Sequence, residues 1–558
     1  MSRTEHEASP REQAIAALTA PGARFEIRRE DVRGNAIAVF ANRHRALPEL
    51  LAASRGFGDA DYLVTEDSRM SFREHHEAVA ALATALRDEY GVRPGDRVAL
   101  CGANSPEWIV AFWASVALGA VAVAMNSHWA GPEIQHGLDL TEPVVVIADE
   151  PRRALLGHPG GAVLSFEEDH PALVAKNRGA PMPETDIAED DPAAILFTSG
   201  TTGRPKGATH SHRNMIAAVW FHLLNDAVAA ELGNPQSGRR YLLLTPLFHI
   251  AALHNLAVIR LAIGDTAVIH RGRFDIDRVL RLIEEERITN WGAVPTMLSR
   301  LVEADLSSYD LSSLRSVTVN SAPSSTLLKE KLLEVLPHVG RALGTSYGLT
   351  ESSTGATIAS AADLLEDSHS VGRPAPTMEV EVREANGLVV TDGVEGEIHL
   401  RGPQVMLGYW QNPEATAAAS APGGWFRTGD LGSMVNGHLR IASRRSDLIL
   451  RGGENVYPAE VEEQLCAHPA VAECIVLGVP DDDFGQAVAT RVVTRPGVDV
   501  TEEDLRGHLL ERLARYKAPT RWALTTDPLP RNATGKVNRG QVELERTGGE
   551  PVGENLED

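Results

Sequence analysis

Short apolar segments alternate with amphipathic helical periods along most of this chain, and this alternation limits the folds open to it. The apolar segments are residues 97–102, 144–149 and 193–199, and the helical periods cover residues 72–91, 107–118 and 274–287. Strands separated by helices in this way are typical of βαβ units, in which helices cover both faces of a largely parallel sheet. The sequence therefore predicts an α/β architecture from about Ala46 onward, whereas the preceding residues give no clear element.

The C-terminal part of the chain follows a different pattern, which predicts a second domain. It combines helical periods at 458–467 and 501–515 with β-like stretches at 473–480 and 486–494. These segments suffice for a small α+β domain, and 558 residues are enough for several folding units. We expect a large N-terminal domain of packed sheets and helices over residues 1–445 and a small domain over residues 446–558.

The charge balance argues against nucleic acid as a partner. The chain carries 53 Lys and Arg against 76 Asp and Glu, a formal net charge of −23. A strongly acidic chain repels nucleic acid and anionic membranes, so any phosphate-bearing ligand must be held by local loops. The acidic runs Glu284–Glu286 and Asp481–Asp483 are expected to be solvated faces or loop charges and not metal sites.

Cysteine usage and the N-terminus favour a cytoplasmic protein. The three cysteines fit a reducing compartment, and the polar N-terminus lacks an apolar signal core. The segment from Trp108 to Met125 carries no formal charge and approaches the length of a membrane span. Gly119 divides it, however, and Ser105-Pro106-Glu107 before it is a typical helix start. We therefore expect a buried helix, a turn and a short strand there.

A loop rich in glycine and hydroxyl groups follows the apolar segment 193–199. Its sequence is Thr198-Ser199-Gly200-Thr201-Thr202-Gly203-Arg204-Pro205-Lys206-Gly207. Glycines let backbone N–H groups approach a ligand closely, hydroxyls donate to phosphate oxygens, and Lys206 and Arg204 supply positive charge. The loop lacks the Gly-Lys-Ser/Thr ending of a Walker A loop. Taken alone it could also be a flexible surface turn.

Further motifs follow the loop in a fixed order. They are residues 347–351 (YGLTE), 425–430 (WFRTGD), 444–447 (RRSD), 452–458 (GGENVYP) and 530–539 (PRNATGKVNR). In order and spacing they resemble the adenylate-forming superfamily, which includes acyl-CoA synthetases, adenylation domains and luciferases. The resemblance runs from about Ala46 to about Val542 and is greatest to fatty-acid or aryl-acid CoA ligases. It implies that the small C-terminal domain is mobile and that ATP binds between the two domains.

The resemblance also implies roles for residues of the large domain. The loop would wrap the ATP phosphates, with Thr201 as a catalytic residue, and Glu351 would hold Mg²⁺, a hard cation that prefers oxygen ligands. Tyr347 would stack on adenine, Thr350 would touch the α-phosphate, and Asp430 would accept from the ribose hydroxyls. The implied nucleotide site further contains Thr198, Ser199, Gly200, Thr202, Gly203, Lys206, Ser321, Ala322, Thr345, Ser346, Gly348 and Arg444.

Other implied roles concern the acyl group and coenzyme A. Lys536 would bridge the substrate carboxylate, the ribose and the α-phosphate, because two anions must meet in the transition state. His249 lies in a motif whose aromatic ring gates the acyl pocket, whereas a metal role for His210 and His212 is disfavoured. Arg273 would meet a CoA phosphate, and Gly452 and Gly453 would let the pantetheine arm pass close to the backbone.

The chain departs from the family pattern around the expected hinge. Ser443 replaces the usual glycine before the ribose-contacting Arg444, and Ser446 stands at the hinge position, which is commonly Asp or Lys. Leu450 stands where some relatives carry a lysine. These changes bear on how the small domain rotates and leave adenylation itself unaffected.

We therefore expect an ATP-dependent acid–CoA ligase whose partners are a carboxylic acid, ATP and CoA, with Mg²⁺ as cofactor. The segment 245–252 lacks the acidic residue that amino-acid-activating relatives use, so the acid is predicted to be apolar: fatty, aryl or polycyclic. Trp220, Phe221 and Trp291 are expected to supply apolar walls. The sequence leaves open transfer to an amine or a carrier-protein thiol, an inactive nucleotide-binding scaffold, and a homodimer.

Overall fold

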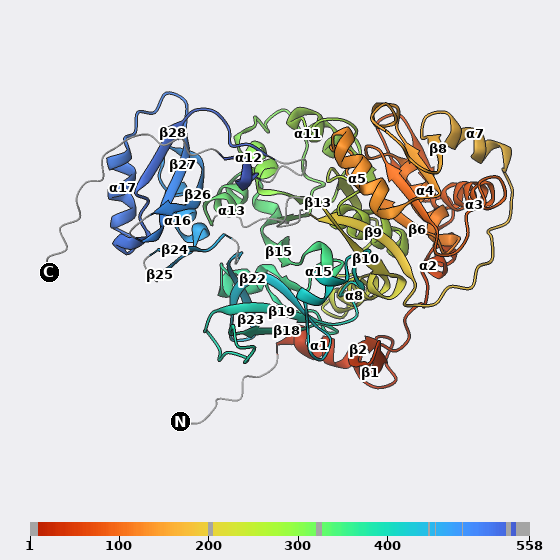
Figure 1. Cartoon of the computed structure of the whole chain (residues 1–558), viewed down its shortest axis with the longest axis horizontal. Coiled ribbons are helices and arrows are strands. Elements are labelled where there is room, and N and C mark those ends of the chain that lie inside the picture. Colours follow the sequence, from red (N-terminus) through yellow and green to blue (C-terminus); the bar gives the residue numbers. More distant parts are fainter. Residues whose placement is uncertain are drawn as a thin grey trace.

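The computed structural model describes residues 9–198, 205–319, 326–444, 447–451, 454–481, 484–531 and 537–542. Two large sheets, covered by helices, form most of the N-terminal part (Figure 1). A third sheet lies beside them, and the C-terminal sheet lies at one end of the molecule. The predicted combination of α/β and α+β layers is confirmed.

The first large sheet carries the phosphate-loop strands. Its order is β20 (Gly408–Tyr409), β10 (Lys206–Ser211), β9 (Pro192–Thr198), β6 (Val121–Ala124), β5 (Arg97–Cys101), β7 (Val145–Ala148) and β8 (Ala162–Ser165). The strands from β9 to β8 are parallel neighbours, whereas β10 runs antiparallel to both β9 and β20. β10 therefore runs back along β9 in the same sheet.

The second large sheet is also parallel at its centre. Its order is β17 (Arg373–Pro374), β16 (Thr357–Ala359), β15 (Leu343–Tyr347), β14 (Ser316–Val319), β13 (Asn290–Ala293), β11 (Arg240–Leu243), β12 (Thr266–Ile269), β3 (Asp61–Val64) and β4 (Arg69–Ser71). Antiparallel strands close both edges. Tyr347 ends β15, so the predicted adenine-site motif follows a strand of this sheet.

Helices cover both sheets. They are α2 (Leu47–Ser54), α3 (Phe72–Asp88), α4 (Pro106–Ala117), α5 (Gly131–Thr141), α6 (Glu150–Arg153), α7 (Asp169–Lys176), α8 (His212–Glu231), α9 (Ile250–Ala252), α10 (Ile259–Ile263), α11 (Ile276–Glu285), α12 (Pro295–Glu303), α13 (Thr326–Val335), α14 (Ala361–Glu366) and α15 (Pro413–Ala418). A π-helical turn, Leu253–Val258, joins α9 to α10. Ser71 caps α3 in a capping box with Glu74, which explains why that helix begins there.

The uncharged segment 108–125 is a buried helix, turn and strand, as predicted. Ser105 accepts a hydrogen bond from the Trp108 N–H at the start of α4. Gly119 has a φ of +68°, a conformation that favours glycine, and β6 follows it fully buried. Among the described residues, no helix is long and apolar enough to cross a membrane.

A smaller third sheet carries the predicted ribose-binding motif. It consists of β18 (Glu379–Arg383), β19 (Gly396–Arg401), β22 (Trp425–Val435), β21 (Ser420–Ala421) and β23 (His438–Arg444), which pairs with β22. Asp430 lies opposite Arg444 in the register of β22 and β23. The two expected ribose contacts therefore stand side by side on adjacent strands.

The C-terminal part contains the predicted helices and strands together with three strands that the sequence did not indicate. It contains α16 (Pro458–Cys466), α17 (Glu502–Leu510), β26 (Val471–Asp481), β27 (Gly485–Thr494), and the additional β24 (Ile449–Arg451), β25 (Glu454–Val456) and β28 (Arg521–Thr525). Its own apolar cluster includes Ile449, Val461, Val488 and Leu505. These residues give the C-terminal sheet a separate core.

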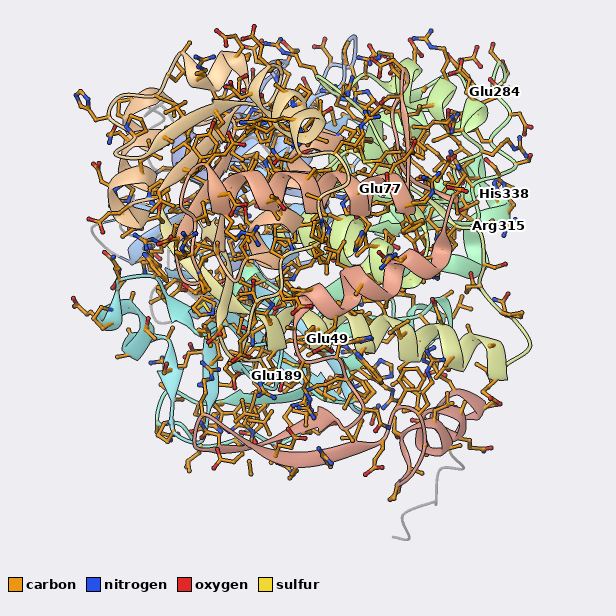
Figure 2. The ribbon with its side chains drawn as sticks, turned by 90° about the vertical axis from the view of Figure 1, so that its right-hand side faces the viewer. Glu49, Glu77, Glu189, Glu284, Arg315 and His338 are labelled. Carbon is orange, nitrogen blue, oxygen red and sulfur yellow. The ribbon has the colours of Figure 1, made fainter. Side chains whose placement is uncertain are left out.

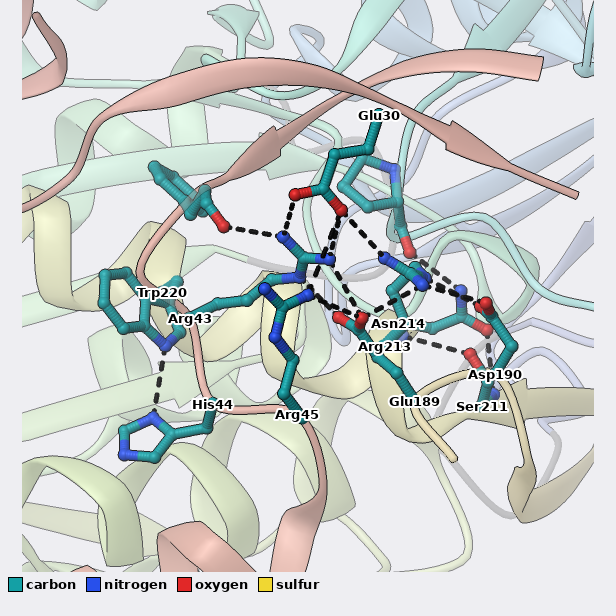
Figure 3. Close-up of polar contacts among 12 residues, drawn as sticks. Glu30, Arg43, His44, Arg45, Glu189, Asp190, Ser211, Arg213, Asn214 and Trp220 are labelled. Carbon is teal, nitrogen blue, oxygen red and sulfur yellow. Dashed lines mark hydrogen bonds and ion pairs between the residues drawn. The ribbon is translucent and has the colours of Figure 1, made fainter. Parts of the chain in front are cut away.

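The N-terminal region is ordered, contrary to the expectation that it lacks clear elements. It forms α1 (Pro10–Thr19) and a hairpin of β1 (Ile27–Val32) and β2 (Asn35–Phe40). The sequence gives no hydrophobic pattern for these elements, because α1 buries no residue and β1 is polar except near its ends. The hairpin is followed by Arg43, whose side chain is 1% exposed and forms an ion pair with Glu30 of β1 (Figure 3).

The acidic runs are only partly solvated. Glu284 lies at the outer edge of the molecule (Figure 2) and Glu285 is exposed, but Glu286 forms ion pairs with Arg69 at 2.7 Å and Arg240 at 2.6 Å. Asp481 is within 3.6 Å of Arg521, and its two successors lie outside the described residues. Within the described ranges, no three His, Cys, Asp or Glu side chains cluster in a way that could hold a metal ion.

The ionised Glu30 side chain contributes to the stability of the fold, and acid removes this contribution. The hydrogen bond from Arg43, the largest cause, lowers the pKa of Glu30 from 4.5 to about 2, with further help from Arg28 and against the effect of burial. A lowered folded-state pKa means that this stabilisation is complete above a pH of 4.5 and is lost as the pH falls toward about 2. We expect Glu30→Gln to lower the free energy of unfolding at neutral pH by about 1.5–3 kcal/mol.

Urea unfolding at several pH values tests this prediction. The difference between wild type and Glu30→Gln should stay constant down to a pH near 4.5 and narrow below it. Glu77→Gln, which removes an exposed pair with Arg73, serves as control and should cost at most about 1 kcal/mol. If the difference in unfolding free energy between wild type and Glu30→Gln does not change with pH, the lowered pKa of Glu30 does not contribute to stability.

Candidate functional site

The base of the predicted phosphate loop is a regular antiparallel pair. Lys206 at the start of β10 lies opposite Thr198 at the end of β9. Several predicted site residues lie outside the described residues: Ser199, Gly200, Thr201, Thr202, Gly203, Ser321, Ala322, Gly452, Gly453 and Lys536, together with the side chain of Arg444. Their roles stay predictions. The other predicted residues can be placed.

Lys206 and Glu351 are brought together by a tyrosine that the sequence analysis missed. The Tyr409 hydroxyl donates to Glu351 Oε1 at 2.8 Å, and Lys206 Nζ lies 5.2 Å from the centre of the Tyr409 ring. Burial and the nearby Glu351 carboxylate raise the pKa of Tyr409, so its hydroxyl stays a neutral donor. Tyr409 therefore orients the carboxylate and offers its ring face to the lysine.

Glu351 is a suitable magnesium ligand. It lies on a short 3₁₀ turn, Thr350–Ser352, directly after the Tyr347 motif. Mg²⁺ prefers oxygen ligands and commonly takes one or two carboxylates together with substrate phosphates. The Glu351 carboxylate, oriented by the Tyr409 hydroxyl, fits this ion if phosphate oxygens complete the coordination.

The predicted adenine and ribose contacts meet across two sheets. The Tyr347 hydroxyl donates to Asp430 Oδ2 at 2.7 Å, although the two residues are 83 positions apart in the chain. The Thr428 hydroxyl accepts from the Asp430 N–H at 3.0 Å and so helps fix the part of β22 that carries the carboxylate. Tyr347 and Asp430 are both buried. The structure thus brings these two predicted residues into direct contact.

The turn after β15 is too tight for side chains at Gly348. A Cβ built there would lie 2.1 Å from the Thr354 carbonyl oxygen, so only glycine fits. Thr345 precedes the turn, with its hydroxyl 3.4 Å from the Val319 carbonyl, and Ser346 and Thr350 flank it half-buried. The backbone at Gly348 therefore packs directly against that of Thr354, which keeps Tyr347 and Glu351 at a fixed separation.

A small cavity lies between the phosphate-loop strand and the Asp430 motif. Its volume is about 270 Å³, and Lys206, Tyr409, Arg427, Thr428 and Gly429 contribute to its lining. Arg427 is also paired with Glu397 at 2.8 Å. Lys206 and the Asp430 motif, more than 200 residues apart in sequence, therefore border the same cavity.

The predicted acyl-pocket segment is apolar. His249 precedes α9, and its ring centroid lies 4.5 Å from that of Phe248, which in turn contacts His128 edge-on at 5.9 Å. Asn104 holds this segment, because its side chain donates to the Thr245 carbonyl and accepts from the Leu247 N–H. Leu247, Phe248 and Ala252 of this segment pack in one apolar cluster that also contains Leu253 and Phe221.

The three aromatic residues proposed as pocket walls do not share one surface. Trp220 packs against Phe25 and Phe40 of the N-terminal region, with ring centroids 5.6 and 5.9 Å apart. Trp291 belongs to a different cluster under α11. Successive helical residues point about 100° apart, which lets neighbouring Trp220 and Phe221 face different surroundings. The two tryptophans therefore lie in different surroundings, and their role as walls of the acyl pocket stays a prediction.

The remaining predicted residues include two histidines and an exposed arginine. His210 Nδ1 lies 3.1 Å from the Ser353 hydroxyl, and His212 Nδ1 accepts from the Leu47 N–H at 3.1 Å. Burial lowers the pKa of each to about 4, so both are neutral near pH 7. Arg273 is exposed on the loop between β12 and α11, and its contact with CoA stays a prediction.

Comparison with known proteins identifies the class. The AMP-binding enzyme model matches residues 50–410, and the model of the AMP-binding enzyme C-terminal domain matches residues 460–536. The chain therefore belongs to the AMP-binding enzyme family. It is an acid–CoA ligase, and enzymes of this kind use ATP, Mg²⁺ and coenzyme A.

Individual relatives agree with this assignment. A feruloyl-CoA synthase of Amycolatopsis is 36% identical over 85% of this chain and 93% of its own. A long-chain-fatty-acid–CoA ligase (FadD13) of Mycobacterium tuberculosis is 34% identical over 84% and 92%. Among solved structures, o-succinylbenzoate CoA synthetase of Bacillus subtilis with ATP and magnesium has a TM-score of 0.76 at 32% identity, covering 88% of this chain and 98% of that one.

Tyr409 provides a test of the site geometry. We expect Tyr409→Phe to reduce the rate of adenylation about tenfold and to raise the Mg²⁺ concentration required, because Glu351 loses a donor that holds it. The measurement is pyrophosphate release against Mg²⁺ concentration. Tyr90→Phe, which removes a hydroxyl just after α3, is the control and should behave as wild type. If Tyr409→Phe also behaves as wild type, Tyr409 does not orient Glu351.

Proposed function

We propose that this ligase activates an apolar carboxylic acid, with a fatty, aryl or polycyclic body. The observation that carries the proposal is the apolar lining of segment 245–252, where Leu247, Phe248 and Ala252 are buried and no residue is acidic. An amino acid would leave its α-ammonium without a counter-charge there, which is costly in an apolar environment. Relatives named for feruloyl and long-chain fatty substrates support this class.

In the first half-reaction the substrate carboxylate attacks the α-phosphorus of ATP, and pyrophosphate leaves. The phosphate loop with Thr201 and Lys206 would hold the β- and γ-phosphates, and Thr350 would touch the α-phosphate. Asp430 and Arg444 would hold the ribose, and Tyr347 would stack on adenine. When bound at Glu351, Mg²⁺ would offset negative charge on the phosphates. Lys536 would bring a movable positive charge to the point where the two anions meet.

In the second half-reaction the CoA thiolate attacks the acyl carbon, and AMP leaves. Lys536 must vacate the site for the thiol, so residues 446–558 would rotate against residues 1–445 as a mobile domain. Ser446 stands at the expected hinge. Arg273 would meet a CoA phosphate, Gly452 and Gly453 would border the pantetheine arm, and His249 with Phe248 would gate the acyl pocket.

A matched pair of acids tests the substrate class. We expect kcat/KM for 3-phenylpropanoate to exceed that for phenylalanine at least about 100-fold, because only the amino acid must bury an unpaired ammonium. Pyrophosphate release over fatty, aryl and polycyclic acids would then rank the preferred body. CoA supplied as the only nucleophile should give a thioester, whereas accumulation of acyl-adenylate would favour transfer to an amine or a carrier-protein thiol. A preference for phenylalanine would overturn the proposal.

Lys536 separates the two half-reactions. We expect Lys536→Ala to reduce acyl-adenylate formation by roughly 10²–10³-fold, the scale of losing one preorganised electrostatic contact. Thioester formation from synthetic acyl-adenylate should stay near the wild-type rate. Lys176→Ala, which removes an exposed lysine of α7, is the control for both. Equal losses in both half-reactions would contradict either the domain rotation or the role of Lys536.

A further inference from the structure

The residues before the family match have no role in the site described so far. The AMP-binding enzyme model begins at residue 50, whereas α1, the β1–β2 hairpin and Arg43 precede it. This N-terminal segment, residues 9–45, lies against the large domain at several places. Arg11 binds Asn225 of α8 at 2.8 Å, and Arg29 pairs with Glu379 of β18 at 3.2 Å.

The most buried of these contacts centres on Arg43. Its guanidinium bonds to both Glu30 and Glu189 and donates to the Phe40 carbonyl at 2.8 Å. Arg43 Nη2 lies 2.7 Å from Glu30 Oε2 and 2.9 Å from Glu189 Oε2. The exposed fraction of the Glu189 side chain is only 9%. Figure 3 shows Arg43 between the two carboxylates, one from the N-terminal hairpin and one from the large domain.

Glu189 in turn belongs to the base of the phosphate-loop hairpin. It lies just before β9, and Arg213, which pairs with it at 3.0 Å, lies just after β10. Arg213 also forms two parallel bonds to Asp190 at 2.7 and 2.8 Å. The backbone closes the same base, because the Arg213 N–H donates to the Glu189 carbonyl at 2.7 Å. The two ends of the β9–loop–β10 unit are thus fastened to each other and to Arg43.

The β9–β10 hairpin connects the charged cluster at its base to Thr198 and Lys206 at its other end. β9 has 7 residues and β10 has 6, at roughly 3.3 Å per residue, so Thr198 and Lys206 lie about 20 Å from the charges. Because β9 also pairs with β6 and β10 with β20, a shift at the base reaches Thr198 and Lys206 through paired strands. Displacements of about 1 Å can reduce the rate of a preorganised reaction about 100-fold.

The choice of charged residues at this place favours a geometric role. Arg28, Arg43, Arg45 and Arg213 face Glu30, Glu189 and Asp190, so each carboxylate of the cluster has an arginine partner. A buried ion pair adds little net stability over well-packed apolar side chains of equal volume. Bidentate arginine–carboxylate pairs do fix direction, because two parallel bonds allow one orientation.

We propose that the N-terminal segment positions the phosphate loop, with Arg43 as the positioning residue that joins Glu30 of the segment to Glu189 at the hairpin base. The inference rests on the proposed phosphate-binding role of residues 198–207. Arg43 does not touch the nucleotide and acts through Glu189 and Arg213. Its loss should therefore weaken ATP use specifically and leave the acid site intact.

The test replaces Arg43 with a residue of similar shape and no charge. We expect Arg43→Met to raise the KM for ATP about tenfold while the KM for the acid and thioester formation from synthetic acyl-adenylate stay near wild type. Arg43→Lys keeps the charge but cannot form both bidentate pairs. Its KM for ATP should therefore lie between those of wild type and Arg43→Met. Arg45→Met is the matched control, because Arg45 is 45% exposed and bonds the same Glu189 from the solvent side at 3.1 Å.

The outcomes separate this inference from the proposed function. A folded Arg43→Met enzyme with an unchanged KM for ATP overturns the inference, and so does an equal loss in both half-reactions, which would indicate general destabilisation. Lys206→Ala is measured in parallel: if it leaves ATP use unchanged, the proposed nucleotide site has failed and this inference with it. If Arg43→Met does not fold, Glu30→Gln is measured instead, and the same rise in the KM for ATP is required of it.

Discussion

The reaction requires two anions to meet inside a protein that is itself strongly acidic. A carboxylate and a triphosphate repel each other, and the net charge of −23 gives no long-range attraction for either. The positive charge must therefore be local and held in place. Lys206, the predicted phosphate-loop cation, faces the ring of Tyr409, while the hydroxyl of the same tyrosine donates to Glu351. One side chain thus sets the distance between the phosphate-loop cation and the expected metal ligand.

This arrangement depends on how the sheets meet. β20, a strand of two residues, places Tyr409 beside β10, and the third sheet places Asp430 against the hydroxyl of Tyr347 at the end of β15. The contacts join segments from three sheets, so each motif is positioned by strand pairing and not by its own loop. Because backbone hydrogen bonds hold these strands, the polar side chains can meet without large ordering costs at the moment of binding.

The accuracy of the sequence predictions follows the strength of the hydrophobic pattern. Strands such as 97–102 and 144–149 are buried on both faces, and their continuous apolar runs predicted them closely. The N-terminal hairpin escaped prediction because β1 is held largely by charged contacts. The motifs indicated Tyr347, Glu351 and Asp430 as nucleotide contacts, but their mutual distances come from strand order. Tyr409 had no signal beyond an aromatic residue between two motifs, and the helical phase that turns Trp220 toward Phe25 depends on the N-terminal packing partner.

Substitutions in the apolar sheets and in the charged cluster around Arg43 should have different effects on the enzyme. Apolar replacements in the large sheets alter volume, whereas the charged cluster around Arg43 sets direction. Replacing all of its charges by well-packed apolar residues could even stabilise the fold. Such a change would remove the bidentate bonds that fix the base of the β9–β10 hairpin. Stability and ATP affinity are therefore separable properties of this cluster, and a variant that gains the first while losing the second would show that the buried charges serve orientation.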